Sequence, residues 1–433
     1  MRPSGADEFI PSGLSSAAQW PEAPDRWSYS SLRDAEECPR RWMLYHATYP
    51  SVWQGVGFPS KPSLPGLVGD VTHGVIELIV RKLHDLGCES LAEPRASEAL
   101  RELGGYSKAI GRVIGERMDA LETNPRVAHR IPAMRAALAA RTPEIRRAVQ
   151  SMVTRTTLKP VRTSERAGVG HRGRRAPLQE GSHPEVWLHA QDLRFWGRAD
   201  LVTLDGDGCT IVDFKTGAPA AHHADQLGTY AVLWNGDREL NPRSVPVRRL
   251  QLTYPAHDVD VAPPSAEEAA ELATELMHRS STVASELGQR PPPARPALDM
   301  CRRCGVRQMC DDYWAGPAVE LLGADVDFID CEAVVLSENG PRSWIISIPA
   351  DGTRGLLRTP TETAAFAVGD RVRLLDTAFV RDEELDRTIL TLTQWSEVSV
   401  LAPSDYAEAE EVSECGSNLP PGTRGKGDPK PTT

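Results

Sequence analysis

The sequence predicts an α/β protein with a mixed central sheet, followed by a small domain made of β-strands. The first prediction rests on the order of elements in residues 185–254, where three strand patterns, a helix and a further strand follow one another. The second rests on five short β runs, separated by Gly, Pro and charged turns, after residue 320. We therefore expect one domain over residues 25–318 and a β-barrel over residues 320–402.

Composition is that of an ordinary globular protein. Of the 433 residues, 40% are hydrophobic and 25% are charged, which is enough for two domains. The N-terminus lacks the pattern of a signal peptide, and no stretch approaches ~18 consecutive apolar residues. We therefore expect a cytoplasmic protein that does not bind membranes.

Charge is unevenly distributed along the chain. The net charge of -11 argues against a surface that binds nucleic acid everywhere. Residues 141–175 nevertheless contain ten Lys or Arg and only two acidic residues. Such a segment is typical either of a solvated, flexible insertion or of a loop that follows phosphates.

The termini and the first half of the domain have recognisable patterns. Residues 1–24 and 403–433 have the composition of disordered tails. A helix should begin near "YSSLRDAEECPRRWMLYH", with Ser30 or Ser31 as its N-cap, and Pro39 should bend or restart it after Cys38. Ala- and Arg-rich helices should fill residues 94–153, within an insertion of about 94–183, with breaks at Pro125, Pro132 and Pro143.

The stretch "GCTIVDFKTG", residues 208–217, places charged groups at the end of an apolar strand. Because side chains alternate along a strand, Asp213 and Lys215 share one face. A single Asp-x-Lys is typical of a solvated ion pair worth at most ~1 kcal/mol. Asp200, on the preceding strand of the predicted hairpin, can come alongside Asp213. Two carboxylates repel each other unless one binds a proton or both bind a hard cation such as Mg²⁺, which suits a phosphodiester substrate and a water held by Lys215.

An amphipathic helix pattern over residues 69–87 adds a candidate metal ligand. The three- and four-residue spacing places His73, Ile76, Glu77 and Val80 on one face. His73 is a candidate nitrogen ligand to the same cation, although a single histidine is more typical of a core or surface position. Glu77 is consistent with a solvated partner of Arg81 one turn later.

Four motifs occur in a recognisable order: His73, "GRAD" ending at Asp200, "DFKTG" from Asp213, and Gln226-x-x-x-Tyr230. This set is similar to the RecB-like branch of the PD-(D/E)XK nuclease superfamily, and the resemblance covers residues 27–315. It implies a restriction-endonuclease-like core with a mixed central sheet flanked by helices.

The resemblance also implies a role for each matching residue. His73, Asp200, Asp213 and the backbone carbonyl of Phe214 would bind Mg²⁺ or Mn²⁺, with Asp200, Asp213 and Lys215 as the catalytic residues. Gln226 and Tyr230 would line the DNA-binding side of the site, and Glu185 is a possible additional acidic residue.

The eight cysteines include a second pattern, Cys38 followed by Cys301, Cys304 and Cys310 in "CRRCGVRQMC". Clustered cysteines in a cytoplasmic chain indicate a metal site or redox chemistry. Four thiolates suit an iron–sulfur cluster or zinc, and a single C-x-x-C favours the cluster. The arrangement resembles the iron–sulfur nucleases of the AddB and Cas4 type, which implies a [4Fe-4S] cluster that ties the N-terminal helix to the segment after the last strand.

Together these patterns predict a metal-dependent DNA nuclease, most typically an exonuclease that acts on DNA ends or single strands in repair, recombination or defence. A helicase or another repair or defence protein is the expected partner. Two alternatives remain: a nuclease-fold protein that binds DNA ends or a helicase without cutting, and an RNA-directed nuclease. No G-x-x-x-x-G-K-[ST] loop is present, which excludes a P-loop motor. The terminal β-domain, with an OB-type barrel as one option, could bind either a protein or a nucleic acid.

Overall fold

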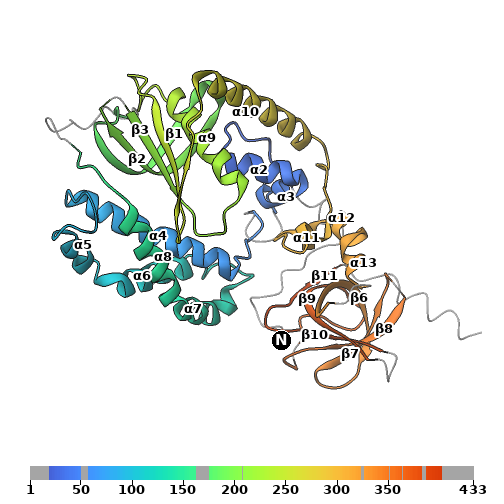
Figure 1. Ribbon diagram of the computed structural model, residues 1–433. Helices are drawn as coiled ribbons and strands as arrows, with labels where there is room; N and C mark the ends of the chain where they lie inside the picture. Colours follow the sequence, from blue (N-terminus) through green and yellow to red (C-terminus); the bar gives the residue numbers. More distant parts are fainter. Residues whose placement is uncertain are drawn as a thin grey trace, which may run out of the picture. The chain divides into compact units, whose positions relative to one another are not determined.

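The computed structural model describes residues 19–49, 57–161, 175–206, 208–322, 326–350, 352–362, 364–382 and 387–401 (Figure 1). They divide into two compact units, with the boundary in the chain between Tyr313 and Trp314. Most of the predicted N-terminal tail and all of the C-terminal one lie outside the described residues. Within the described part of the first tail, Gln19 pairs with Thr48 and Trp20 packs against the core.

A five-stranded sheet forms the centre of the first unit. Its strands are β1 (Gly181–Ala190), β2 (Phe195–Asp205), β3 (Gly208–Phe214), β4 (Val247–Thr253) and β5 (Asp258–Val261), in the order β1-β2-β3-β4-β5. Strands β3 and β4 pair in parallel and the other neighbours are antiparallel. The predicted mixed sheet is therefore confirmed. The edge strand β5 was not expected, because its four residues, "DVDV", give too short an alternation to recognise.

Helices cover both faces of this sheet (Figure 1). One hydrophobic core joins the sheet to α2 (Tyr29–Glu37), α3 (Pro39–His46), α9 (Ala221–Gly236) and α10 (Ala266–Leu287). The other joins it to α4 (Leu64–Asp85), α5 (Ala96–Glu102), α6 (Gly105–Asp119), α7 (Ile131–Ala140) and α8 (Thr142–Arg155). The short elements are η2 (Ala128–Arg130), η3 (Gln191–Leu193), α11 (Leu298–Cys301), η4 (Arg307–Met309), α12 (Asp311–Ala315) and α13 (Pro317–Leu322).

Local sequence explains most helix ends, with one correction. The N-cap of α2 is Ser28, whose side chain accepts a hydrogen bond from the Ser31 N–H at 3.1 Å, so the expected cap at Ser30 or Ser31 was wrong. Pro39 does restart the chain, because it occupies the first turn of α3. Prolines 132 and 143 likewise lie in the first turns of α7 and α8, where a missing N–H costs nothing.

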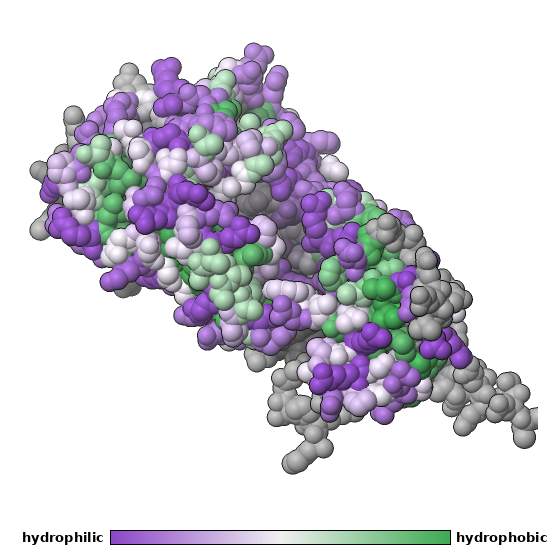
Figure 2. Space-filling view, turned by 60° about the horizontal axis from the view of Figure 1, so that its bottom comes forward, coloured by the Kyte–Doolittle hydropathy of each residue, from purple (hydrophilic) through white to green (hydrophobic). Residues whose placement is uncertain are grey.

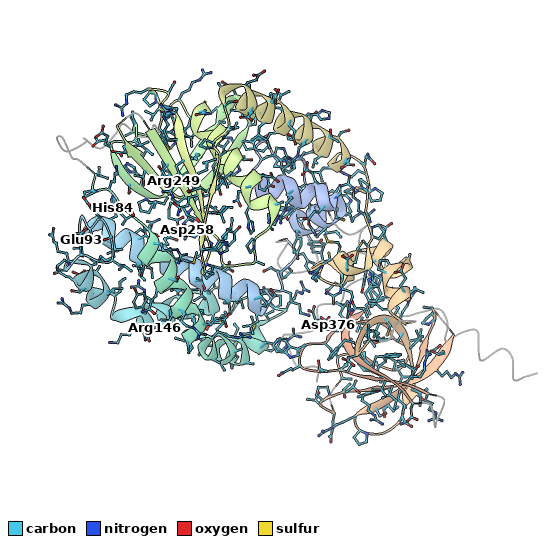
Figure 3. The ribbon with its side chains drawn as sticks, in the orientation of Figure 1. His84, Glu93, Arg146, Arg249, Asp258 and Asp376 are labelled. Carbon is cyan, nitrogen blue, oxygen red and sulfur yellow. The ribbon has the colours of Figure 1, made fainter. Side chains whose placement is uncertain are left out.

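Two basic residues in the described part of the segment 141–175 form ion pairs with the sheet. Arg155 Nε lies 3.0 Å from an oxygen of Asp258, which is labelled in Figure 3 at the start of β5. Lys159 pairs with Asp205 at the end of β2. These contacts fasten α8 and the chain that follows it to the sheet. Residues 162–174 lie outside the described residues, so the choice between an insertion and a phosphate-binding loop stays a prediction.

The second unit is a β-barrel. Its strands are β6 (Phe328–Glu338), β7 (Ser343–Ile348), β8 (Thr353–Arg358), β9 (Arg371–Asp382), β10 (Arg387–Thr391) and β11 (Glu397–Val400). The sheet order is β10-β8-β7-β6-β9-β11, and β10 also pairs with β9, so five strands close on themselves. The predicted small barrel is therefore confirmed. The last predicted β run is two strands, β10 and β11.

A register shift between β6 and β9 is accommodated at Asp376 (Figure 3), which has a positive φ of 52°. The Asp376 N–H donates a hydrogen bond to the Asp330 carboxylate at 2.7 Å. The Asp330 side chain therefore supplies an acceptor at the position where the backbone hydrogen bonds between β6 and β9 are interrupted.

None of the helices among the described residues is both long and apolar enough to cross a membrane. Figure 2 shows one face of the protein, on which hydrophilic residues predominate and hydrophobic residues gather in patches.

Candidate functional site

Two carboxylates come together where β2 and β3 run side by side. The register pairs Leu201 with Val212, so Asp200 and Asp213 are the next residues in line. The Phe214 N–H donates a hydrogen bond to Asp200 Oδ2 at 2.6 Å. Asp213 is only 3% exposed. The structure therefore brings together the two aspartates that the hairpin pattern had predicted to approach each other.

Both carboxylates are held in an unfavourable environment. Burial raises the pKa of Asp200, and the neighbouring Asp213 raises it further. Burial also raises the pKa of Asp213, while the Lys215 ammonium opposes this shift. Lys215 Nζ lies 2.7 Å from Asp213 Oδ2, but this buried oxygen accepts no hydrogen bond of good geometry from the described residues. A buried, incompletely satisfied carboxylate is costly unless a further cation joins it.

A short chain of hydrogen bonds orients Lys215. Its ammonium donates to Gln226 Oε1 at 2.7 Å, and Gln226 Nε2 donates to the Tyr230 hydroxyl at 2.8 Å. Gln226 and Tyr230 lie one turn apart on α9. The helix can approach the sheet closely because residue 197 is glycine: a Cβ there would lie 2.8 Å from the Tyr230 ring.

His73 reaches the carboxylates from α4. Its Nδ1 lies 4.0 Å from Asp200 Oδ1. The buried Ile76 and Val80 fix the helix in the core, as the amphipathic pattern predicted. Burial lowers the pKa of His73, with the neighbouring Asp213 and the Phe214 backbone acting in the opposite direction. A neutral imidazole is the form that binds a metal.

A third carboxylate and an arginine complete this region. Glu185 has a φ of 59°, and burial, followed by the charges of Asp200 and Glu77, raises its pKa to about 7. Arg198 forms an ion pair with Glu185, and a second with Glu77 at 3.1 Å. Glu77 also keeps the expected pair with Arg81, at 2.8 Å. The β1–β2 register pairs Pro184 with Leu201 and Val186 with Ala199, so Glu185, which the sequence offered as a possible additional acidic residue, lies level with Asp200.

The donor set fits a hard divalent cation. Two carboxylates with raised pKa values, a neutral imidazole and a carboxylate oxygen without a hydrogen bond are the groups that Mg²⁺ or Mn²⁺ would satisfy. As the side chains stand in the described residues, no three His, Cys, Asp or Glu are close enough to hold a metal ion.

The four cysteines of the Cys38 and "CRRCGVRQMC" pattern lie in the same unit, away from the carboxylate site. A cavity of about 30 Å³ is lined by Cys38, between α2 and α3, and by Cys301, Cys304 and Cys310. All four are free thiols. Burial raises the pKa of Cys301 and Cys304, and raises that of Cys310 to about 12. The structure thus brings together two segments that are far apart in the sequence.

The family model of the PD-(D/E)XK nuclease superfamily matches residues 26–311, which include every residue of the carboxylate site. The chain belongs to this superfamily. Membership implies a metal-dependent nuclease that hydrolyses phosphodiester bonds, and Mg²⁺ or Mn²⁺ is the metal that such enzymes typically use.

No curated protein matches the sequence. Similar solved structures include the tetrameric p202 HIN2 (18% identity, 17% of this chain and 40% of that chain, TM-score 0.15) and SSO0001 (19%, 30% and 59%, TM-score 0.19). A third is a murine DNA-binding protein bound to double-stranded DNA (8%, 51% and 94%, TM-score 0.16). The match to this chain therefore covers less than two thirds of the length of p202 HIN2 and of SSO0001. These TM-scores are too low to inform fold or function.

Proposed function

We propose that the protein is a metal-dependent DNA nuclease that acts as an exonuclease on DNA ends or single strands, in repair, recombination or defence. The observation that carries the proposal is the buried pair of Asp200 and Asp213 beside Lys215, with one Asp213 oxygen that accepts no hydrogen bond of good geometry from the part of the chain that the structure describes. A pair of aspartates kept only for stability would be better replaced by apolar residues.

His73, Asp200, Asp213 and the Phe214 carbonyl would hold Mg²⁺ or Mn²⁺, which when bound supplies positive charge to the scissile phosphate. The remaining groups belong to the chain itself. Lys215 has three ammonium hydrogens: it donates one to Gln226, and its ion pair with Asp213, which lacks good hydrogen-bond geometry, takes up a second. The third can hold the attacking water or a phosphate oxygen, and Gln226 fixes the direction in which it points.

Cleavage of end-labelled single-stranded DNA, double-stranded DNA and RNA with Mg²⁺ or Mn²⁺ tests this function. Asp213→Asn and Lys215→Ala should each lower the rate by about 10³-fold, the upper range for removal of one catalytic group. The matched control is Asp260→Asn, since Asp260 is exposed and pairs with Arg249 at the far edge of the sheet. A folded wild-type protein that binds DNA without cutting it would make the protein a binding or helicase-partner subunit. Preferential cutting of RNA would change the substrate class.

We also propose that the cysteine cavity holds a [4Fe-4S] cluster. Four thiols from two distant segments around one small cavity support this, because four cysteines are the usual ligand count of such clusters. Protein purified without oxygen should be brown and contain iron, and Cys38→Ala should lose both the colour and thermal stability. Cys88→Ala, a buried cysteine outside the cavity, is the control. A colourless protein with stoichiometric zinc would replace the cluster assignment and leave the nuclease proposal intact.

The closure of five strands supports an OB-type barrel for the second unit, since that architecture is a five-stranded Greek-key barrel.

A further inference from the structure

Two tryptophans lie stacked on the surface of the β1–β2 hairpin. The rings of Trp187 and Trp196 are 4.9 Å apart between centroids and inclined by only 12°. Their exposed fractions are 44% and 37%, whereas most aromatic side chains of the described core are buried. The pair therefore leaves a large apolar, π-rich surface in water, which is unfavourable unless something covers it.

The hairpin holds this pair in place. Trp187 lies opposite Arg198 in the register, and His189 lies opposite Trp196, so the two tryptophans are diagonal neighbours on one face. The Arg198 guanidinium lies 6.0 Å from the centre of the Trp187 ring. A cation that also pairs with Glu185 and Glu77 therefore lies at the rim of the aromatic surface.

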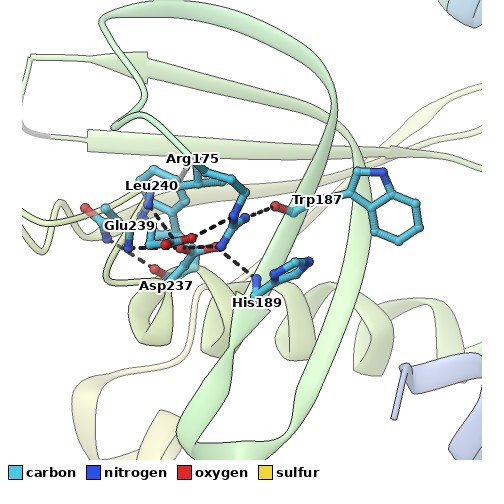
Figure 4. A network of polar contacts seen from close by, with 8 residues as sticks. Arg175, Trp187, His189, Asp237, Glu239 and Leu240 are labelled. Carbon is cyan, nitrogen blue, oxygen red and sulfur yellow. Dashed lines mark hydrogen bonds and ion pairs between the residues drawn. The ribbon is translucent and has the colours of Figure 1, made fainter. Parts of the chain in front are cut away.

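A network of polar contacts around the buried Asp237 fixes the backbone beneath Trp187 (Figure 4). Arg175 donates a hydrogen bond to the Trp187 carbonyl at 2.6 Å and binds both carboxylate oxygens of Asp237, at 3.0 and 2.9 Å. Asp237 also accepts a hydrogen bond from the His189 N–H at 2.9 Å. The backbone is therefore held on both sides of residue 188, while Figure 4 shows the Trp187 ring pointing away from the network.

The tryptophan pair is continuous with the candidate active site. Arg198 lies next to Trp187 and forms ion pairs with Glu185 and Glu77, and Glu185 lies level with Asp200 on the neighbouring strand. Asp200 follows Trp196 by four residues on β2, a distance of about 13 Å along a strand. That distance corresponds to roughly four nucleotides stacked at ~3.4 Å.

We propose that Trp187 and Trp196 form a stacking platform for unpaired bases of a nucleic-acid strand whose scissile phosphate lies at the carboxylate site. A single strand is the occupant that the observations favour, because its unpaired bases expose π-faces that can stack on the two exposed rings. A duplex hides the faces of its bases. The inference rests on the proposed nuclease function and names the substrate class: single-stranded nucleic acid longer than about four nucleotides.

Binding and cleavage by the full-length protein test the platform. Binding of a long fluorescent oligothymidylate is measured with Ca²⁺ in place of Mg²⁺, and turnover of bis(p-nitrophenyl) phosphate is measured with Mg²⁺ or Mn²⁺. Trp187→Ala and Trp196→Ala should each weaken oligothymidylate binding by about tenfold or more. Turnover of the small phosphodiester, which is too short to reach the platform, should stay the same. Trp187→Phe should retain most of the binding, and Met277→Ala, at an exposed apolar position on α10, should retain all of it.

Each outcome decides one of the two proposals. If the wild type binds and cuts single strands and the alanine variants do so equally well, the platform is wrong and the nuclease proposal stands. If the variants lose turnover of the small phosphodiester as much as strand binding, the tryptophans serve the fold and the platform is again wrong. A wild type that cuts neither substrate overturns the proposed function itself.

Discussion

Asp213 and Asp237 are two buried aspartates of the same domain, with exposed fractions of 3% and 1%, and their surroundings are opposite in kind. Asp237 accepts hydrogen bonds from Arg175 on both oxygens and from the N–H groups of residues 189, 239 and 240. Asp213 has Lys215 on one oxygen, in a contact without good hydrogen-bond geometry, and the carboxylate of Asp200 close by.

This difference in hydrogen-bond partners distinguishes an aspartate that stabilises the fold from one that is available to bind a ligand. Every strong partner that Asp237 can use is supplied by the chain, so folding alone satisfies it. Asp213 is left with capacity for another positive group, and burial raises its pKa. An incompletely satisfied buried charge next to a like charge is the arrangement expected where a ligand completes the set.

The largest expected effect concerns stability. In protein freed of metal with a chelator, Asp237→Asn should lower the free energy of unfolding by about 3 kcal/mol, because it removes the buried charge on which Arg175 and three backbone N–H groups converge and leaves Arg175 paired with Glu239 alone. Asp213→Asn should leave the free energy of unfolding unchanged or increase it, because the lost ion pair with Lys215 is offset by the removal of a buried charge next to Asp200. Urea unfolding of both variants measures the contrast, and equal losses would show that the two sites do not differ in this way.

An intermediate effect is expected at Gln226. Gln226→Leu removes the acceptor of the Lys215 ammonium without touching a carboxylate, so kcat should fall about tenfold while KM for DNA changes little. Gln289→Leu, at an exposed position just after α10, provides the control. If KM rises and kcat is unaffected, Gln226 contacts DNA, as the family resemblance implied, and does not position Lys215.

The smallest effect is a dependence of stability on pH. The pKa of Glu185 is about 7 in the folded protein against an ordinary value of 4.5, so its proton favours the folded state at low pH. This contribution is complete below about pH 4.5 and is lost as the pH rises to 7. The Tm of the metal-free protein should therefore fall over that range, and less so in Glu185→Gln. Parallel melting curves of the two proteins would argue against a raised pKa.

The sequence allowed much of the carboxylate site to be predicted. Strand alternation placed Asp213 and Lys215 on one face, and hairpin spacing brought Asp200 alongside. The positions of these residues follow from the alternation of side chains along a strand, which can be recognised in the sequence alone. The barrel was predictable for the same reason, since its strands alternate with clear turn residues.

The contacts that the sequence did not reveal depend on pairings across the fold. In the sequence, Arg198 is indistinguishable from a solvated surface charge. The strand register and the ion pairs place it beside Trp187 and Glu185. Arg175 lies at the edge of a basic run, and nothing local indicates that Asp237, far along the chain, will bind it. The N-cap at Ser28 was missed because three serines within four residues compete for that position.

Gly197 makes the distance between α9 and the sheet depend on a single carbon atom. A side chain there meets the Tyr230 ring at 2.8 Å, and that ring is the far end of the hydrogen-bond chain that orients Lys215. One added methyl group would thus change the chemistry without altering any charged residue, the platform or the carboxylates. We expect Gly197→Ala to bind its substrate without hydrolysing it. Such a variant would allow the natural substrate to be isolated in complex with the protein.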